Sequence, residues 1–346
     1  MDPSSRSTAA ATAVILVLVG LAIVVLLTVG GGGGGPASDP SEAGPSGTST
    51  GAVPSTTAPP ANPTNPTDPS APATTPSGSP TIRQDGTVCV PQVTEKTITV
   101  MTFNIKSGRV TGRVDIGKVG DQIAVYQPDI VMMQEVEKGR PVSNYIDEPA
   151  VLADQLKMQW TFGGNDRRSA TNQLGNATLS RFPILDSVNT QLPARPGKHR
   201  RGLLATTIDL GGIEVEVFNT HLEHTSGADR ERQIAVVAGI VGASKAPKFL
   251  GGDFNSGPVG PVLGRARTVV RDSWTEVGSG AGLTAPSGRP RVRIDYLLYS
   301  GGGDVAVTPL RMEVLPTNAS DHRAVMASYR ITKDEGEICL PVVAED

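Results

Sequence analysis

Short apolar runs recur between residues 98 and 331, and each has the length and β-branched composition of a strand. Three other segments repeat apolar residues every three or four positions, which is the helical period. The predicted strands are Ile98–Ile105, Asp129–Val136, Ala177–Ile184, Leu203–Leu210, Ile213–Leu222, Lys248–Asn255, Arg293–Tyr299 and Ala324–Ile331; the predicted helices are Val114–Tyr126, Pro149–Gln159 and Ala228–Val241. Strands and helices mix without strict alternation. We therefore predict an α/β fold of two packed mixed β-sheets flanked by helices.

The hydrophobic pattern near the amino terminus is of another kind. Residues 9–29 form 21 consecutive positions without a charge, enough for a helix to cross a hydrocarbon layer of about 30 Å. We predict one transmembrane anchor here. The alternative is a secretory signal that is cleaved to release a secreted protein, but the apolar core of such signals usually runs about 7–15 residues, and no convincing Ala-x-Ala site follows. Arg6 precedes the span, so we expect residues 1–8 in the cytoplasm and the rest outside the cell membrane.

Residues 30–88 are rich in Gly, Pro, Ser, Thr and Ala and contain almost no large apolar residue. Such a segment cannot offset the entropy lost on ordering, so we predict a disordered linker. It serves as a plain spacer or as an O-glycosylated stalk, and the spacer is the simpler interpretation. The folded domain is predicted to span residues 89–346.

The two cysteines bracket this predicted domain, because Cys89 stands at its start and Cys339 stands near its end. In an oxidising compartment they would form a disulfide that joins the ends of the domain. The alternative is two unrelated thiols. We favour the disulfide because of these positions and the predicted location.

The charge of the domain argues weakly against a dedicated nucleic-acid binder. The formal net charge of the whole chain is -3, yet residues 89–346 contain 29 basic and 29 acidic residues. A neutral domain lacks the strong positive field that proteins living on nucleic acid usually have. A nuclease with a locally basic cleft is still compatible with this balance.

Polar side chains stand at the ends of most predicted strands, where a rim of the sheets would collect them. They are Asn104, Glu135, Asn219, His221, Asp253, Asn255, Asp295, Asp321 and His322. Carboxylate and amide oxygens suit Mg²⁺ or Mn²⁺, whereas 4 histidines and 2 distant cysteines offer little for a zinc site. A divalent cation, a carboxylate that handles a water proton and an imidazole are the ingredients of phosphoester hydrolysis. Each residue alone has an ordinary structural explanation, but the set is chemically coherent.

The ordered motifs of the domain resemble those of the endonuclease/exonuclease/phosphatase superfamily, which includes deoxyribonuclease I, abasic-site endonucleases, neutral sphingomyelinases and inositol polyphosphate 5-phosphatases. The motifs are Met101-Thr-Phe-Asn104, Gln134-Glu135-Val136, Gly175-Asn-Ala-Thr-Leu-Ser-Arg181, Asn219-Thr-His221-Leu222, Gly251-Gly-Asp253-Phe-Asn255, Arg293-Ile-Asp295-Tyr296 and Ser320-Asp321-His322. They extend from Ile98 to Tyr329 in the superfamily's order. The resemblance implies a four-layer, deoxyribonuclease I-like α/β sandwich.

The resemblance also implies a role for each site residue. Glu135, Asn104 and Asp321 would surround the Mg²⁺ or Mn²⁺ ion. Asp253 would act on the attacking water or the leaving group, and Asn255 would hold the phosphate. His322, paired with Asp295, would contact the scissile phosphate, and His221 would act from the other side. Asn176 and Asn219 would complete the pocket.

Basic residues gather at 195–201 and at 289–293. Arg201 precedes Gly202 as in related secreted or membrane-linked members, so we expect it to contact phosphate. The acidic residue that often precedes this Arg-Gly pair is replaced by Lys198-His-Arg-Arg201, which changes the local charge. We interpret the other arginines, with Arg293 as a second exception, as parts of solvated loops.

The leading functional hypothesis is a monomeric, metal-dependent phosphodiesterase or phosphatase. It would act outside the membrane on a phosphoester such as a lipid headgroup, a nucleotide or nucleic acid. The main alternative is an extracellular non-specific nuclease of the deoxyribonuclease I type, whose binding would weaken steeply with salt. A third hypothesis is a binding domain that has lost catalysis, and it requires a missing central residue. Glu135, Asp253, Asn255, Asp295 and His322 are all present.

Overall fold

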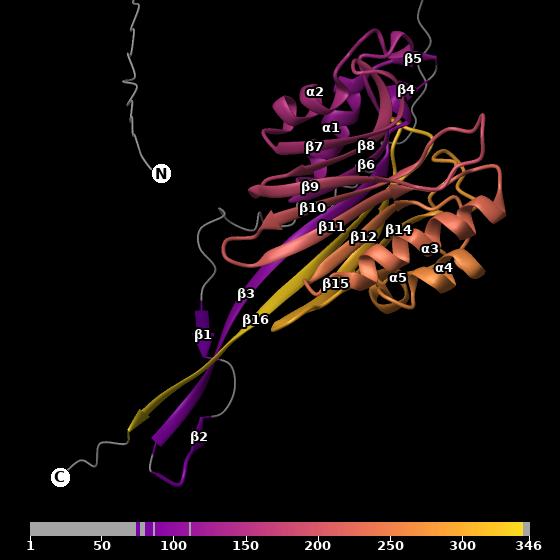
Figure 1. Cartoon of the computed structure of the whole chain (residues 1–346). Helices are drawn as coiled ribbons and strands as arrows, with labels where there is room; N and C mark the ends of the chain where they lie inside the picture. Colours follow the sequence, from indigo (N-terminus) through magenta and orange to yellow (C-terminus); the bar gives the residue numbers. More distant parts are fainter. Residues whose placement is uncertain (1–73, 77–79, 86, 111, 342–346) are drawn as a thin grey trace, which may run out of the picture. The chain divides into compact units, whose positions relative to one another are not determined.

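Two mixed β-sheets pack face to face and carry helices on their outer faces (Figure 1). The structure is a computed structural model that describes residues 74–76, 80–85, 87–110 and 112–341. The prediction of two packed mixed sheets flanked by helices is confirmed. Within these ranges no helix has the length and hydropathy needed to cross a membrane, and the span predicted at residues 9–29 lies outside them.

The first sheet has the strand order β15-β16-β3-β6-β8-β7, with β1 and β2 also paired to β3. Its strands are β1 (Thr74–Pro76), β2 (Thr81–Ile82), β3 (Thr87–Asn104), β6 (Ile130–Lys138), β7 (Gln159–Ser169), β8 (Asn172–Ser180), β15 (Val305–Leu315) and β16 (Ala324–Pro341). The pair β3 and β6 is parallel and the other pairs are antiparallel. Strands β1 and β2 lie within the range predicted as linker. The β-sheet pairing therefore begins before residue 89, where the domain was expected to start.

The second sheet has the order β13-β14-β12-β11-β10-β9, and here only β11 and β12 run parallel. Its strands are β9 (Ile184–Gln191), β10 (Gly202–Asp209), β11 (Glu214–His221), β12 (Lys248–Asp253), β13 (Arg271–Asp272) and β14 (Asp295–Ser300). A separate short ribbon joins β4 (Arg109–Val110) to β5 (Arg113–Val114). Each sheet therefore has one parallel pair near its centre, and the carboxyl ends of these pairs carry Asn104, Glu135, His221 and Asp253.

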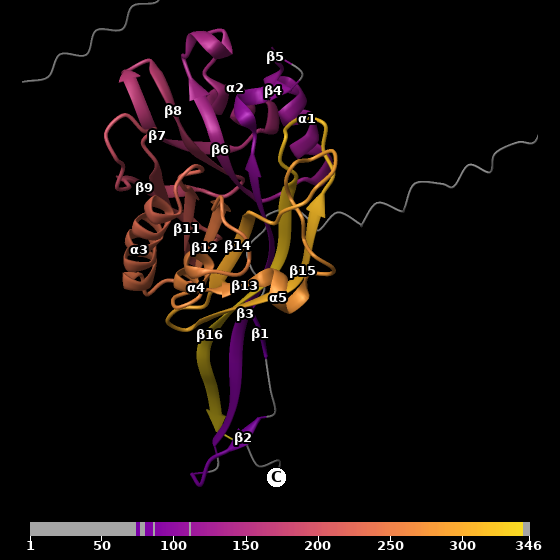
Figure 2. The same ribbon diagram turned by 90° about the vertical axis from the view of Figure 1, so that its right-hand side faces the viewer.

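Most of the helices cover the two outer faces, whereas the helix at Ser273–Val277 packs against the core between the sheets through Trp274 and Val277. The helices are α1 (Ile116–Tyr126), α2 (Glu148–Leu156), α3 (Gly227–Ala243), α4 (Pro261–Ala266) and α5 (Ser273–Val277), with 3-10 turns η1 (Lys106–Gly108) and η2 (Pro141–Ser143). Figures 1 and 2 show α1 and α2 beside the first sheet and α3 and α4 beside the second. The start of α1 is capped by Asp115, whose side chain accepts a hydrogen bond from the amide of Lys118.

Alternating apolar residues fill three cores, which explains the nearly continuous hydrophobic runs of the central strands. In β3, Val100 faces the core between the sheets, whereas Met101 and Phe103 face α1 and α2. In β12, Phe249 faces the core between the sheets and Leu250 faces α3. Strands buried on both faces hold their ends in fixed relative positions. The polar residues at those ends therefore also have fixed positions relative to one another.

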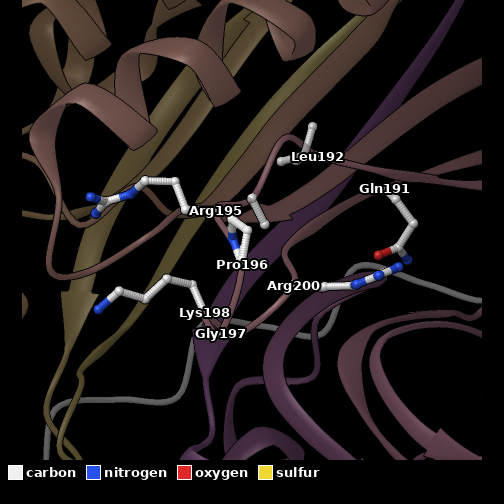
Figure 3. Close-up of a pocket in the computed structure, with 8 residues that line it drawn as sticks. Gln191, Leu192, Arg195, Pro196, Gly197, Lys198 and Arg200 are labelled. Atoms are coloured by element: carbon white, nitrogen blue, oxygen red, sulfur yellow. The ribbon is translucent and has the colours of Figure 1, made fainter.

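The loop between β9 and β10 carries many of the basic residues of the second sheet. It spans residues 192–201, and its base is closed by a hydrogen bond from the amide of Leu192 to the carbonyl of Arg201 (2.9 Å). Figure 3 shows Arg195, Lys198 and Arg200 lining a cavity at this loop. The loop thus places one basic cluster immediately before Arg201.

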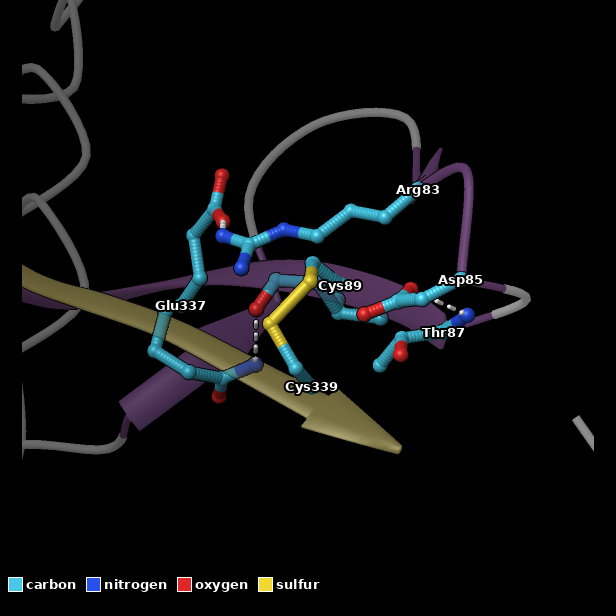
Figure 4. Close-up of a disulfide and its surroundings, with 8 residues drawn as sticks. Arg83, Asp85, Thr87, Cys89, Glu337 and Cys339 are labelled. Carbon is cyan, nitrogen blue, oxygen red and sulfur yellow. Dashed lines mark hydrogen bonds and ion pairs between the residues drawn. A yellow bond between two sulfur atoms is a disulfide. The ribbon is translucent and has the colours of Figure 1, made fainter. Parts of the chain in front are cut away.

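The strands β3 and β16 continue together beyond the rest of their sheet (Figure 2). Cys89 of β3 and Cys339 of β16 are register partners near the end of this extension, and they form a disulfide (Figure 4). Arg83 and Glu337 make an ion pair beside it at 3.1 Å. The cysteine pairing predicted from the sequence is thus present in the structure.

Candidate active site

Three neighbouring strands of the second sheet bring acidic and imidazole groups to one rim. His221 ends β11, Asp253 ends β12 and Asp295 begins β14, and the three are register partners across the sheet. His322 precedes β16, yet its ring reaches Asp295 and Asp253 from the first sheet's side. Residues predicted separately as strand-end polar groups therefore meet in one pocket.

Asn104 connects the two sheets at the centre of this pocket. Its amide nitrogen donates to Oε1 of Glu135 and to Oδ2 of Asp253, both at 3.1 Å, and its amide oxygen accepts from the backbone amide of Lys106. Glu135 has φ +54°, in the left-handed region, at a register shift of β6. Such a bulge turns a strand side chain away from its regular direction and is found next to active sites. It directs the Glu135 carboxylate toward Asn104.

Asp253 is a buried carboxylate with an unusual proton affinity. The backbone amide of Asn255 donates to its Oδ1 at 2.8 Å, and only 1% of the residue is exposed. Burial, followed by the nearby negative charge of Asp295, raises the pKa of Asp253 to about 7, although His322 and the two hydrogen bonds act in the opposite direction. A carboxylate with this pKa is suited to accept and return a proton near neutral pH.

His322 is held as a cation by its acidic neighbours. Its Nδ1 lies 2.9 Å from Oδ2 and 3.2 Å from Oδ1 of Asp295, and its Nε2 lies 3.8 Å from Oδ2 of Asp253. Burial alone would lower the pKa of His322, but the charge and hydrogen bond of Asp295, with Asp253 and Asp321, raise it to about 10. The ring therefore carries a positive charge that faces the pocket through Nε2.

His221 is the neutral imidazole of the site. Burial, followed by the positive charge of Arg201, lowers the pKa of His221 well below its usual value. Nη1 of Arg201 lies 2.9 Å from Nδ1 of His221, and a guanidinium can only donate. The other ring nitrogen, Nε2, lies 3.0 Å from Nδ2 of Asn255 and 3.4 Å from Oδ2 of Asp253, and Nδ2 of Asn255 also donates to the carbonyl of Leu222.

Asn176 and Asn219, predicted to contact substrate, lie beneath the pocket. The Asn219 amide donates to the carbonyls of Met133 and Ala177 in the opposite sheet and accepts from Gln134. Asn176 donates to the carbonyls of Gly202 and Asn219. Both are buried, and these bonds satisfy backbone carbonyls. They join the two sheets and position the strand that carries His221. The substrate contact predicted for them stays a prediction.

Several contacts of the site were not predicted from the sequence. The ammonium group of Lys106 pairs with Asp321, and the hydroxyl of Ser320 donates to the carbonyl of Asn104 at 2.6 Å. Thr284 accepts hydrogen bonds from the amides of Ile294 and Asp295. Ser320 belongs to the recognised motif, so its position beside Asp321 was an available signal; nothing in the sequence pairs Lys106 with a residue 215 positions away.

Arg293, the second predicted exception among the arginines, does not reach the pocket's acids. It is buried, its Nη2 donates to Asp272 at 2.7 Å, and its guanidinium lies 4.9 Å from the ring centre of Tyr296. Arg201 is likewise buried, but its contact with His221 places it at the site. Of these two arginines, only Arg201 has the position expected of a phosphate contact.

The donor set fits a hard divalent cation better than zinc. Within the described ranges, Asp253, Asp295 and His322 have ligand atoms within 4.8 Å of one another, but a protonated His322 bonded to Asp295 is a poor ligand. Glu135, Asn104 and Asp321 instead supply oxygens only, which suits Mg²⁺ or Mn²⁺. These residues therefore fit such an ion.

A buried carboxylate near its titration point, a charged imidazole paired with an aspartate and a cluster of oxygen donors define a class of site suited to phosphoester hydrolysis. The profile of the Endonuclease/Exonuclease/phosphatase family matches residues 101–322, which is more than half of the chain. The chain belongs to this family. The superfamily expected from the sequence motifs is confirmed.

Individual relatives agree with this assignment. Nocturnin of Rattus norvegicus is 27% identical over 208 residues, covering 52% of this chain and 47% of Nocturnin, so the chain spans about half the length of that relative. An endonuclease/exonuclease/phosphatase structure from Beutenbergia cavernae DSM 12333 is 26% identical with a TM-score of 0.55, covering 68% of this chain and 72% of the other. Mannosyl-6-phosphatase of Bacteroides thetaiotaomicron VPI-5482, 16% identical with a TM-score of 0.54, shares the fold over 67% of this chain and 99% of its own.

Proposed function

We propose that this protein is a metal-dependent phosphoester hydrolase that acts on the extracytoplasmic side of a membrane, with phosphorylated lipid headgroups among its substrates. The observation that carries the proposal is the pairing of Asp253, with a pKa of about 7, and the His322 imidazolium, with a pKa of about 10, in one pocket. Oδ2 of the first and Nε2 of the second are 3.8 Å apart. A base and a cation at this separation can act on a water and on a phosphate at once.

In this proposal each residue has a defined task. Asp253 accepts the proton of the attacking water, and Asn255 keeps the carboxylate in place through its backbone amide. His322 donates from Nε2 to a phosphate oxygen while Asp295 holds the ring. Positioning and charge stabilisation of this kind supply most of the rate in phosphoryl transfer.

The metal and the arginine complete the charge balance. Mg²⁺ or Mn²⁺ held by Glu135, Asn104 and Asp321 would neutralise phosphate oxygens. Arg201 provides a fixed positive charge on the other side of the pocket and orients His221. Because Arg201 is buried, its charge acts through a medium that screens it weakly.

The test is an assay of the full chain against bis(4-nitrophenyl) phosphate, DNA, RNA, sphingomyelin and phosphoinositides, with Mg²⁺, with Mn²⁺ or with EDTA. We expect hydrolysis of at least one phosphoester, loss of activity with EDTA and recovery when Mg²⁺ or Mn²⁺ is added. Activity that persists fully in EDTA would contradict the metal dependence. No hydrolysis of any of these substrates would contradict the catalytic proposal and favour a binding domain.

A non-specific extracellular nuclease is the second candidate, and the exposed basic residues of loop 192–201 favour it. Phosphate contacts along a strand release counterions, so nuclease activity should fall steeply as salt is raised. Hydrolysis of a lipid headgroup should depend instead on the amount of interfacial substrate. The same assay repeated over a salt series separates the two candidates.

We also propose that residues 9–29 anchor the chain in the cell membrane with the catalytic domain outside. The uncharged length of the segment supports the anchor, and the Cys89–Cys339 disulfide supports an oxidising compartment. Fractionation should place the chain in the membrane pellet, and protease added to intact cells should digest the domain. Recovery of the domain in the culture medium would favour the cleaved, secreted form.

A further inference from the structure

The extension in which β2, β3 and β16 pair, here called the ribbon, has one face made of aliphatic side chains (Figure 2). Register partners on antiparallel strands point to the same face of a sheet, and alternate residues of one strand share a face. Val88 is the partner of Ile82 in β2 and of Leu340 in β16, and Val90 is the partner of Ile338. These five residues form two adjacent rows, which we call the aliphatic face.

The aliphatic face is open to solvent over the described residues. The exposed fractions are 76% for Ile82, 54% for Ile338 and 64% for Leu340, while Val88 and Val90 are half-buried. Single exposed aliphatic residues are normal on a protein surface, but five in two adjoining rows make a contiguous patch. Such patches mark places where a protein associates with another molecule or with a membrane.

The opposite face of the ribbon has a different composition. It carries the Cys89–Cys339 disulfide, and the register partner of Pro91 on this face is Glu337. Glu337 pairs with Arg83 at 3.1 Å, and Figure 4 shows both side chains beside the disulfide. The ribbon is therefore amphipathic, with an ion pair on one face and aliphatic side chains on the other.

The size of the aliphatic face argues against a second protein chain as its partner. Five Val, Leu and Ile side chains offer at most roughly 300–600 Å² of apolar surface. A stable protein–protein interface buries about 800 Å² on each partner. A bilayer has no such minimum for a chain that is already tethered to it, because the tether raises the local concentration of the docking surface.

The ribbon is the part of the described chain that is nearest in sequence to the proposed membrane anchor. The anchor is the uncharged segment 9–29, and the first described strands, β1 and β2, both pair with β3 in this region. Residues 30–73 lie between them and can span at most about 150 Å. An anchored chain therefore has the bilayer within reach of the ribbon.

We propose that the aliphatic face docks on the surface of a lipid bilayer, with Ile82, Ile338 and Leu340 in contact with acyl chains. The proposal rests on the membrane location proposed above and goes beyond it, because it assigns the surface that lies against the bilayer. It does not depend on which phosphoester is cleaved. Docking by a face lays the ribbon along the bilayer, so β3, which continues to Asn104, leaves the docked part along the membrane surface.

The docking is apolar in origin. The ribbon offers no unpaired cation among Arg83 and Lys333, since Arg83 pairs with Glu337 and Lys333 pairs with Glu335 at 3.0 Å. The aliphatic face should therefore dock on phosphatidylcholine without anionic lipid. High salt should leave the docking unchanged, because salt screens charges and does not weaken apolar burial.

The test places a fluorescent probe on the aliphatic face and measures its contact with acyl chains. The chain has two cysteines and both form the disulfide, so an introduced cysteine supplies the free thiol for labelling. Ile82→Cys carries an NBD fluorophore, and the full chain is reconstituted into phosphatidylcholine vesicles with plain or brominated acyl chains. We expect the brominated lipid to quench the emission. A probe at Val188→Cys, an exposed position of β9, should not be quenched.

A pair of substitutions on the face tests whether its side chains hold the ribbon on the bilayer. Ile338→Ser/Leu340→Ser in the Ile82→Cys chain should remove the quenching, because the ratio of docked to free ribbon falls about tenfold or more when two aliphatic side chains are lost. Both positions are exposed, so the circular dichroism spectrum should be unchanged.

The matched control is Leu185→Ser/Val188→Ser, also in the Ile82→Cys chain. It removes two aliphatic side chains with similar exposed fractions, 52% and 56%, from the edge strand β9. This variant should keep the quenching. Equal loss of quenching in the two variants would overturn the assignment to the aliphatic face.

Other partners of the aliphatic face give other results. If a second copy covers it, oxidation of unlabelled Ile82→Cys gives a disulfide-linked dimer, and brominated lipid does not quench the probe. If residues 30–73 of the same chain cover it, the probe emits alike in vesicles and in detergent micelles, again without quenching. Either result overturns the bilayer as the partner.

Failure of the proposed function is recognised separately, because the quenching does not require hydrolysis. A chain that cleaves no phosphoester, yet loses the quenching in Ile338→Ser/Leu340→Ser, contradicts the catalytic proposal and supports the docking. A chain that is released into the medium is labelled and added to preformed vesicles of the same lipids. Quenching there supports the docking without the anchor, and its absence overturns the docking.

Discussion

The same surroundings raise the pKa of both Asp253 and His322, but for different reasons. Burial moves the pKa of the carboxyl up to about 7, near the point where it changes charge in neutral solution. The three surrounding carboxylates more than offset the effect of burial on the imidazole and raise its pKa to about 10. The surroundings of the two groups therefore make Asp253 the base and keep His322 protonated at neutral pH.

The pH dependence of hydrolysis should follow these two groups. Asp253 acts when deprotonated, so kcat/KM should rise as pH increases through about 7. His322 acts when protonated, so kcat/KM should fall above a pH of about 10. In His322→Ala we expect a loss of about 10²- to 10⁴-fold and no descending limb, with an unchanged circular dichroism spectrum. Unchanged turnover would contradict the role assigned to His322.

Asp295 raises the pKa of both groups, so its replacement tests the electrostatic explanation. In Asp295→Asn both limbs of the pH profile should move to lower pH, because a negative charge that favours the protonated forms is removed. Asp209→Asn is the control, since Asp209 caps the turn at Gly211 and Gly212 and ends β10 away from the site. A variant that loses activity without any movement of the limbs would indicate a purely structural Asp295.

Sequence alone could predict the residues at strand ends but not all their contacts. Asp253 and His322 are recognisable because polar groups at the ends of buried strands are chemically unusual, and motif order relates them to a family. The Lys106–Asp321 pair depends on how β3 and β16 align, which is a tertiary property. Asn219 illustrates a second limit, because the sequence does not show that this strand-end amide donates to a carbonyl of the opposite sheet.

Gly252 shows how the backbone of one element positions the catalytic carboxylate. It immediately precedes Asp253 in β12 and has φ +140°. A Cβ atom at this position would lie 1.8 Å from the carbonyl oxygen of Thr220 in β11. The parallel strands β11 and β12 can approach in this way only because the residue is glycine. Their approach brings His221 beside Asp253.

We predict that Gly252→Ala lowers the free energy of unfolding by about 3 kcal/mol or more, because the backbone of β11 or β12 must shift to admit the methyl group. Gly239→Ala is the matched control: it lies on an exposed position of α3, and an added Cβ meets nothing within 4 Å. That change should raise the free energy of unfolding by about 0.5–1 kcal/mol. Urea denaturation of both variants checks the pair, and equal effects would contradict the proposed close approach.

The burial of a strand determines whether its sequence pattern predicts it. The central strands were found because both of their faces are apolar, as in Ile130–Lys138. The edge strand β9 is largely exposed and polar, so it has no strand-like apolar pattern. Strand β15 alternates buried and exposed residues at its start, but Pro309 at a register shift interrupts the sequence pattern. The outer parts of β3 and β16 were also missed, because their exposed residues show no regular apolar alternation.

The whole molecule depends on connections between its two sheets. Each sheet contributes only part of the pocket, with Asn104 and Glu135 from the first and Asp253 from the second. The apolar core between the sheets supplies most of their cohesion, while the amides of Asn176 and Asn219 fix their relative positions. A change that lets the sheets slide would therefore separate the groups of the site before it unfolds either sheet.

The disulfide links the ends of the domain at a distance from the site. Cys89 and Cys339 are separated by 250 residues of sequence, and reduction would release a closed loop of that size in the unfolded chain. Cys89 and Asn104 lie on the same strand, 15 residues apart, which corresponds to about 50 Å of extended chain. The bond should consequently affect the stability of the domain without affecting the chemistry of the pocket.

In Cys89→Ser/Cys339→Ser we expect the free energy of unfolding to fall by about 2–5 kcal/mol, because the unfolded chain regains the entropy that the cross-link removes. Guanidinium denaturation followed by circular dichroism measures the fall, and kcat/KM for bis(4-nitrophenyl) phosphate should stay within twofold of the wild-type value. The wild-type chain treated with a reducing agent should show the same shift. An unchanged midpoint would mean that the paired ends of β3 and β16 separate independently of the domain, since a cross-link stabilises only what unfolds together with it.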